Sequence, residues 1–166
     1  MQQDAPVPAP RSSAKVATRA DALARIARLP RPLVMTNGVF DLLHRGHVTY
    51  LEQARALGAA LVVAVNSDES VKRLGKGDDR PLNPLDDRMA VVAALRAVDL
   101  VVPFDGDTPR DLIVAAMPDV LVKGGDYSAT TTAGAAEVLA RGGRFVAIPF
   151  VFDRSTSSLM SRIRGR

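Results

Sequence analysis

The chain has 166 residues, of which 47% are hydrophobic and only 4% aromatic, and it carries a formal net charge of +4 with no cysteine. This length is typical of one domain, and the missing cysteines exclude disulfides, thiolate metal sites and a cysteine nucleophile. No apolar run approaches the roughly 18 residues of a membrane helix, and the N-terminus lacks the apolar stretch of a secretory signal. We therefore expect a cytoplasmic protein that does not associate with membranes.

The positive charge lies near the N-terminus. Residues 1–31 hold six basic and two acidic residues, whereas the remainder holds 16 of each. A nucleic-acid-binding protein is expected to concentrate positive charge on its folded surface, so nucleic acid is not an expected partner. The proline-rich composition predicts a disordered arm over residues 1–17 and a single domain over 18–166. Deletion of the arm is therefore expected to leave activity intact.

Helices and strands alternate in the first half of the chain. Leucine and isoleucine at one-face spacing predict a helix over 19–29, which two prolines end. Two apolar runs without polar alternation, 33–35 and 60–65, predict parallel strands that are covered on both faces. The stretch 47–57 between them has a helical pattern, and Gly58 is a suitable C-terminal cap.

The same alternation continues to the C-terminus. Further strands are predicted at 99–104, 119–122 and 144–149. Further helices are predicted at 68–74, 85–97, 108–117 and 132–141, and from Ser155 or Thr156 to about residue 164. Strands that alternate with helices indicate βαβ units with right-handed crossovers. The predicted fold class is α/β: a single doubly wound, Rossmann-like domain with a five-stranded parallel sheet and helices on both faces.

Polar residues gather directly after four of the predicted strands. They occupy 36–41, 66–68, 123–127 and 155–158. In a doubly wound sheet, ligands bind beyond the carboxyl ends of the strands, near the point where the strand order reverses. The sequence therefore predicts one ligand site to which four strand ends contribute.

Both histidines of the chain, His44 and His47, stand where the first of these turns meets the next helix. Unpaired N–H groups and the helix dipole make such a junction a natural anion site. Two histidines at this spacing could instead hold a metal ion, with a carboxylate such as Asp41 as a further ligand. Two histidines rarely suffice for a tight metal site, so no protein-held metal is predicted.

The run Thr36–His47, T-N-G-V-F-D-L-L-H-R-G-H, resembles the cytidylyltransferase-like branch of the nucleotidyltransferases, and its H-x-G-H matches residue for residue. The resemblance implies that His44 and His47 contact nucleotide phosphates and stabilise the charge that builds as the α-phosphate is attacked. A side chain at Gly46 would obstruct the approach of the nucleotide to the backbone. The matching aspartate, Asp41, lies in the reaction pocket of the related enzymes, although it could also cap a local turn.

Lys123 leaves a predicted strand directly before two glycines, where the backbone can approach a phosphate closely, and it is predicted to be catalytic with the two histidines. A solvated loop lysine is the alternative. The tail from Arg154 resembles the family's second motif, whose hydroxyl and N–H groups hold the outer phosphates, although Ser155 or Thr156 could equally be a plain helix cap. Arg80 and Arg88 could bind ligand or pair with Asp79, Asp86 or Asp87. The residues predicted to bind nucleotide are Thr36, Asn37, Gly38, Phe40, Gly46, Asn66, Arg88, Gly124, Asp126, Ser155, Thr156 and Ser157, and those predicted to bind the acceptor are Asp41, Asp68 and Arg80.

Three stretches, Ala-Val-Asn-Ser-Asp, Arg-Pro-Leu-Asn-Pro-Leu and Lys-Gly-Gly-Asp-Tyr, are similar to the adenylyltransferases of ADP-heptose synthesis. This resemblance implies transfer of AMP from ATP to D-glycero-β-D-manno-heptose 1-phosphate, with Mg²⁺ as cofactor, pyrophosphate as second product, and a homodimer. The chain is too short to include the sugar kinase that some relatives carry, so it would be a stand-alone form. A glycerol-phosphate or ethanolamine-phosphate cytidylyltransferase is an alternative, as is a nucleotide-binding regulator without turnover.

Overall fold

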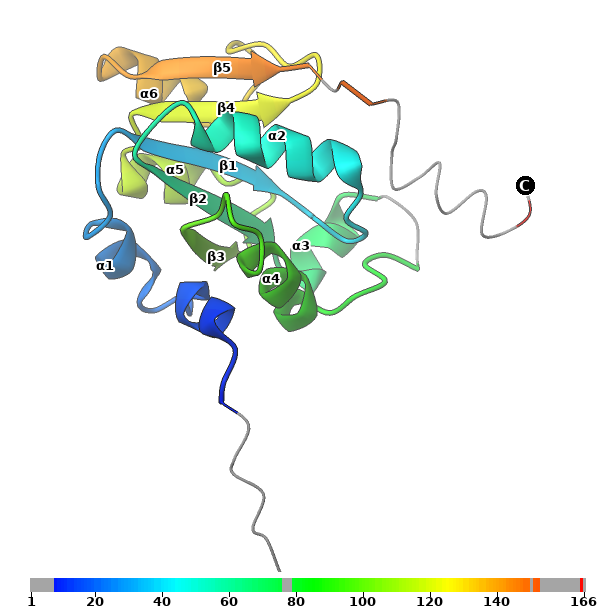
Figure 1. The fold of residues 1–166 in the computed structure, drawn as a ribbon. Coiled ribbons are helices and arrows are strands. Elements are labelled where there is room, and N and C mark those ends of the chain that lie inside the picture. The colour runs from blue at the N-terminus through cyan, green and yellow to red at the C-terminus, as the bar shows by residue number, and fades with distance from the viewer. Residues whose placement is uncertain (1–7, 76–78, 150, 153–164, 166) are drawn as a thin grey trace, which may run out of the picture.

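Five parallel strands form the sheet at the centre of the chain (Figure 1). The computed structural model describes residues 8–75, 79–149, 151–152 and 165. The strand order is β3-β2-β1-β4-β5, so the predicted fold class is confirmed. The strands are β1 (Leu33–Gly38), β2 (Ala60–Asn66), β3 (Leu100–Phe104), β4 (Val120–Gly124) and β5 (Arg144–Ile148).

Side chains of the central strands alternate between two hydrophobic cores. Every residue of β2 is buried. Val62 and Ala64 pack into the core on one face of the sheet, whereas Val63 and Val65 pack into the core on the other face. Because helices cover both faces, apolar residues occupy positions 60–65, and this explains the unbroken apolar run that ends at Asn66.

Helices cover both faces of the sheet (Figure 1). One face is covered by α2 (Arg45–Arg55) and α4 (Leu85–Ala93), and the other by α1 (Ala22–Ile26), α5 (Arg110–Ala116) and α6 (Ala135–Ala140). A short helix α3 (Asp68–Arg73) follows β2, and the Ser67 hydroxyl caps it by accepting the N–H of Ser70. The helices are shorter than the patterns at 19–29 and 85–97 predict, because those segments end in turns. The helix predicted from Ser155 lies outside the described residues.

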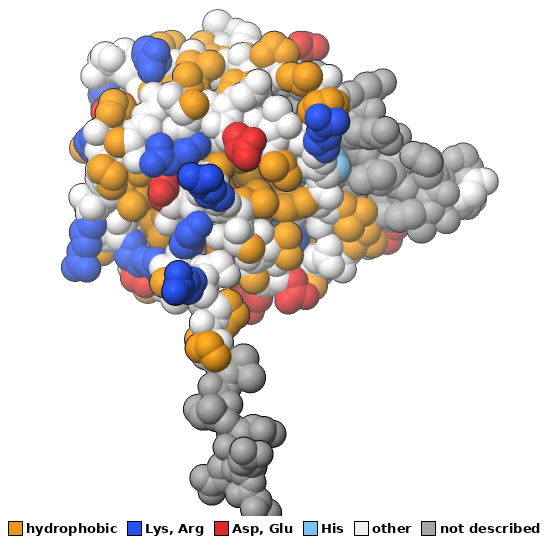
Figure 2. Space-filling view, viewed as in Figure 1, with side chains coloured by type: hydrophobic (Ala, Val, Ile, Leu, Met, Phe, Trp, Pro, Cys, Tyr) orange, Lys and Arg blue, Asp and Glu red, His pale blue; other side chains and the backbone are white. Residues whose placement is uncertain are grey.

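The surface formed by α2 and α4 is chemically mixed. Figure 2 shows charged side chains of both signs and hydrophobic ones side by side on this face. Among the described residues, no helix is long and apolar enough to cross a membrane.

The strand order reverses between β1 and β4. The chain runs from β1 through β2 to β3 on one side, and then crosses over to β4 and β5 on the other. In the register, Met35 of β1 lies opposite Val62 of β2 and Leu121 of β4. At such a point the following connections leave in opposite directions, which opens a crevice at the carboxyl ends of the two strands. The crevice should therefore lie beside Asn37 and Lys123.

The segment before α1 is folded onto the sheet, so the predicted disorder is wrong for residues 11–17. Arg11–Lys15 form a 3₁₀ helix, and Val16 forms a parallel bridge with Val101 of β3. Ala17 is buried, and the guanidinium of Arg25 donates to the carbonyl of Val16. Composition did not reveal this segment because its apolar contacts are few and lie far along the chain. Residues 1–7 of the predicted arm lie outside the described residues.

Deletion of residues 1–17 is therefore expected to destabilise the fold, whereas deletion of residues 1–8 should not. The longer deletion uncovers the edge of β3 and removes the Ala17 contact, for which we expect a loss of about 2 kcal/mol in the free energy of unfolding. Urea denaturation of both truncated proteins measures the difference. Equal midpoints for the two truncations would show that the segment adds no stability.

Candidate active site

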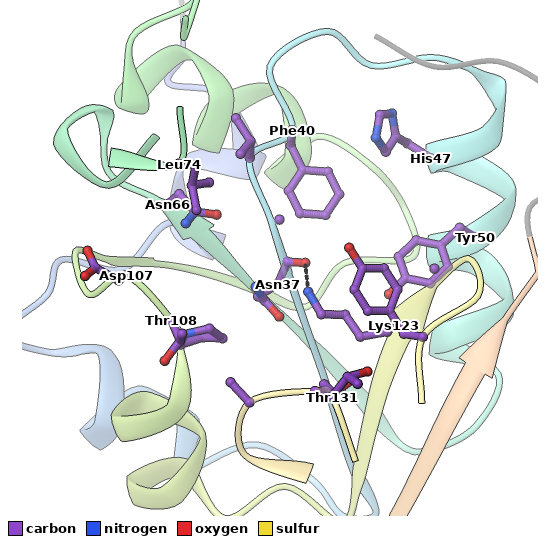
Figure 3. A pocket seen from close by; sticks show the side chains of 17 residues that line it. Asn37, Phe40, His47, Tyr50, Asn66, Leu74, Asp107, Thr108, Lys123 and Thr131 are labelled. Atoms are coloured by element: carbon purple, nitrogen blue, oxygen red, sulfur yellow. Dashed lines mark hydrogen bonds between the residues drawn. The ribbon is translucent and has the colours of Figure 1, made fainter. Parts of the chain in front are cut away.

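A cavity of about 410 Å³ opens at the carboxyl ends of the strands, where the strand order reverses (Figure 3). Side chains and backbone from β1, α2, β2 and β4 contribute to its wall. Of the residues that the sequence predicts for the site, those that line it are Asn37, Gly38, Phe40, His47, Asn66, Lys123 and Gly124. The structure thus brings together predicted residues from three separate strand ends.

The two histidines lie against each other at the start of α2. Their ring centroids are 4.0 Å apart, with 33° between the ring planes. The backbone N–H of His44 donates to Nδ1 of His47 at 3.4 Å. Because Nδ1 accepts, the ring proton of neutral His47 belongs on Nε2. His47 lines the cavity, so this N–H is available as a donor to a ligand there.

Burial keeps both imidazoles uncharged when no anion lies beside them. Burial lowers the pKa of His47 to about 4, and the neighbouring His44 ring contributes to this shift. Burial also lowers the pKa of His44. A negative charge in contact with an imidazole favours its protonated form, so a polyphosphate bound beside the two rings would raise both pKa values. The pair can therefore act as neutral donors or become cationic when an anion binds.

A hydrogen bond and an aromatic contact help to hold Lys123 at the end of β4. Its Nζ donates to the backbone carbonyl of Asn37 at 3.4 Å and lies 5.4 Å from the centre of the Tyr127 ring. The second distance is within the range of a cation–π interaction. Figure 3 shows Lys123 and His47 on the same side of the cavity. Two groups that can bind phosphate oxygens therefore lie in one part of the site.

Thr36 does not reach the cavity, contrary to its predicted contact with nucleotide. Its side chain is fully buried, and its hydroxyl is hydrogen-bonded to the hydroxyl of Tyr50. Tyr50 in turn donates to the carbonyl of Val122 at 3.3 Å. Burial raises the pKa of Tyr50, so its hydroxyl stays protonated. These bonds tie α2, which carries His44 and His47, to β1 and β4 beneath the cavity.

Phe40 has a left-handed backbone conformation, with φ of 50°, that folds its ring back over the turn. The ring is buried and its centroid lies 5.5 Å from that of His47. A Cβ at Gly38 would lie 3.0 Å from this ring, so a larger residue would push the ring from its position. Gly38 thus allows Phe40 to pack beside the histidine that lines the cavity.

Asp41 and Arg80 pair with each other, although both were predicted to bind the acceptor. The side chain of Asp41 is 1% exposed, and Nε of Arg80 lies 3.1 Å from its Oδ2. The carboxylate also accepts the backbone N–H groups of Leu82 and Asn83 at 3.0 Å. These contacts anchor the loop before α4. Sequence spacing could not identify this pair because 38 residues separate the two side chains.

Arg88 is a buried structural residue, which corrects its predicted role in nucleotide binding. Its side chain is 0% exposed. The guanidinium donates to the carbonyls of Val39, Asn66 and Asn83 at 2.7, 2.8 and 3.0 Å, and to the Asp68 carboxylate at 2.7 Å. Asp68, which was predicted to bind the acceptor, is thereby paired with Arg88. A helical pattern did not show that Arg88 lies on the inner face of α4.

The remaining predicted residues do not line the cavity or lie outside the described residues. Gly46 is buried in the first turn of α2, and Asp126 is exposed and does not line the cavity. Ser155, Thr156 and Ser157 lie outside the described residues. The lining residues that the sequence did not predict include Asp107, Thr108, Thr131 and Thr132. Asp107 and Thr108 follow β3. The rule that polar residues after a strand line the site, which was applied to the other strands, could have identified them.

The metal alternative for the two histidines lacks a third ligand in the described residues. These residues include no group of three or more His, Cys, Asp or Glu side chains that could hold a metal ion. Asp41, the carboxylate considered for this role, is occupied by the loop before α4.

Comparison with known proteins gives close relatives. Residues 35–158 match the family described as cytidylyltransferase-like. The chain is 60% identical to the D-beta-D-heptose 1-phosphate adenylyltransferase of Bordetella bronchiseptica, over 93% of this chain and 96% of that protein. It is 58% identical to the bifunctional protein HldE of Shewanella denitrificans over 81% of this chain, which corresponds to only 28% of that protein.

Solved structures share the fold. The lipopolysaccharide core biosynthesis protein from Thermoplasma volcanium is 27% identical with a TM-score of 0.59, and the match covers 73% of this chain and 98% of that one. Pantothenate synthetase from Thermus thermophilus is 19% identical with a TM-score of 0.58, over 81% of this chain and 61% of that one, which shows the fold alone. The family match includes β1, both histidines and Lys123. The chain belongs to the cytidylyltransferase-like family of nucleotidyltransferases.

Proposed function

We propose that the protein transfers the adenylyl group of ATP to D-glycero-β-D-manno-heptose 1-phosphate, giving ADP-heptose and pyrophosphate. The observation that carries this proposal is the 60% identity, over nearly the whole of both chains, to an adenylyltransferase named for heptose 1-phosphate. The cavity supports it with phosphate-binding groups on one side and amide, hydroxyl and carboxylate groups on the other. For the bifunctional relatives, the chain spans less than a third of their length, so only the matching part bears on this activity.

The reaction is a direct displacement. An oxygen of the sugar phosphate attacks the α-phosphorus of ATP, and the bond from that phosphorus to the bridging oxygen breaks. The electron pair of this bond leaves with pyrophosphate. Charge develops on the oxygens of the transferred group, and the N–H of His47 and the ammonium of Lys123 are positioned to donate to them. His44 contributes through its contact with the His47 ring, and no covalent enzyme intermediate is needed.

Further parts of the proposal rest on the resemblance. Ser155, Thr156 and Ser157 are proposed to hold the outer phosphates. Magnesium is proposed to accompany ATP and to neutralise part of the phosphate charge. The described residues fit an ion that is held chiefly by the nucleotide, because Asp107 lines the cavity without two further ligating side chains beside it. We also propose a homodimer and a cytoplasmic location.

The test is a comparison of substrate pairs by pyrophosphate release. With Mg²⁺, kcat/KM for ATP and heptose 1-phosphate should exceed that for CTP with glycerol 3-phosphate or phosphoethanolamine by about 100-fold or more, because mismatched polar groups lose buried hydrogen bonds. A His47→Ala preparation controls for contaminating activity. Faster turnover of either cytidylyl pair would overturn the assignment, and nucleotide binding without any turnover would favour a regulator.

A further inference from the structure

The cavity has two chemically different halves (Figure 3). Lys123 and His47 lie on one side, while Asn66, Asp107 and Thr108 lie on the other. In the described part of the chain, no lysine or arginine other than Lys123 lines the cavity. A triphosphate is attracted to the half with the ammonium and imidazole, and the Asp107 carboxylate repels it from the other half. The second half instead suits an uncharged group that is rich in hydroxyls.

Asn37 lies between these halves with an unused acceptor. Its Oδ1 is buried and has no hydrogen-bond partner among the described residues. A buried amide oxygen without a donor typically costs about 1–3 kcal/mol, so its persistence calls for a ligand that donates. Phosphate oxygens accept hydrogen bonds and cannot donate when ionised. A hydroxyl group can meet this requirement.

Asn66 is fixed so that its amide oxygen is also free to accept. Its Nδ2 donates to Oγ of Ser70 at 2.9 Å, and the Ser70 hydroxyl donates to the carbonyl of Gly106 at 2.9 Å. A serine hydroxyl has one proton, and here it goes to Gly106, so Ser70 must accept from the amide nitrogen. The amide of Asn66 therefore cannot flip without the loss of this bond. Its oxygen is the group left for the cavity that Asn66 lines.

We infer that Asn37 and Asn66 form a pair of amide-oxygen acceptors that bind hydroxyl groups of the phospho-sugar acceptor. Asn37 is the last residue but one of β1 and lies opposite Ala64 of the neighbouring strand β2, and Asn66 is the last residue of β2, two positions beyond Ala64. Both side chains therefore lie on the same face of the sheet at the strand ends that line the cavity. The sugar hydroxyls lie in this half, and the sugar phosphate reaches toward Lys123 and His47. This inference deepens the proposed function and rests on it, and it moves both residues from nucleotide recognition to acceptor specificity.

The first test is Asn37→Ala. This side chain makes no hydrogen bond to the described residues that the change would remove, so the melting temperature should not fall. The KM for heptose 1-phosphate should rise about 10-fold, the effect of one lost hydrogen bond, while the Kd for ATP, measured by calorimetry without acceptor, should stay within about twofold. Ser70→Ala is the second variant, because it releases the Asn66 amide without altering the cavity wall. It should also raise the acceptor KM and leave the Kd for ATP unchanged.

Acceptor analogues that lack one hydroxyl give a mutant cycle. Consider an analogue that binds the wild type more weakly than the full acceptor does. The Asn37→Ala variant should bind this analogue and the full acceptor equally well, because the deleted hydroxyl and the deleted amide form one interaction. A parallel rise in the ATP Kd would place Asn37 in the nucleotide half, and an unchanged acceptor KM would show no contact; either result overturns the inference. Failure of the proposed function would appear differently, as a wild type that prefers another phospho-acceptor, and the same KM comparison would then use that acceptor.

Discussion

Replacement of His47 by alanine should lower kcat by about 100- to 1,000-fold, the usual effect of the loss of one preorganised donor, or roughly 3–4 kcal/mol. His47 lines the same cavity as Lys123, where charge is proposed to develop on the transferred phosphoryl group. Since this donor meets the most charge in the transition state, the Kd for ATP should change far less than kcat. Single-turnover rates and calorimetry with ATP measure the two quantities separately.

The neighbouring histidine provides the control for this interpretation. His44→Ala should also lower kcat, and the double variant should lose less than the product of the two single losses, because His44 acts through the His47 ring. The fold should survive, since the hydrogen bond of the His47 side chain to the described residues is a long one, 3.4 Å. Near-normal turnover by a folded His47→Ala protein would contradict the proposed mechanism.

The sequence was sufficient to predict the sheet, because its strands are covered on both faces. The apolar run of β2 has no polar position, and turns follow each strand, so strand number, direction and fold class could all be inferred. The segment before α1 could not be predicted in this way. Val16 is a single residue that bridges to Val101, and a pairing between residues so far apart leaves no local pattern.

Site residues could be predicted where they follow strands. They were harder to predict where a side chain could point either into the cavity or into the protein interior. Asn37, His47 and Lys123 line the cavity as their strand-end positions suggested. Asp41 and Arg88 occupy equally suggestive positions, yet their side chains turn into the protein and hold loops. Polar residues that support the site from within the protein and polar residues that line the cavity are of the same types. Only the packing of the folded chain shows which role each residue has.

Replacement of Arg88 by methionine should lower the free energy of unfolding by about 3–5 kcal/mol, as expected when the fully buried cation of a half-buried ion pair is removed with its hydrogen bonds. The change leaves Asp68 without its cation and deprives the carbonyls of Val39, Asn66 and Asn83 of their donor. For a chain of this size, the melting temperature should fall by roughly 10 °C.

Two matched variants separate charge from geometry in this prediction. Arg88→Lys keeps the positive charge but cannot reach all four acceptors from one planar group, so it should recover only part of the lost stability. Arg80→Met removes an arginine whose partner Asp41 retains two backbone N–H donors, so it should cost about 1 kcal/mol. The role first predicted for Arg88 gives the opposite result: if Arg88→Met unfolded at the wild-type temperature but bound ATP much more weakly, the guanidinium would contact the nucleotide and the structural role would be wrong.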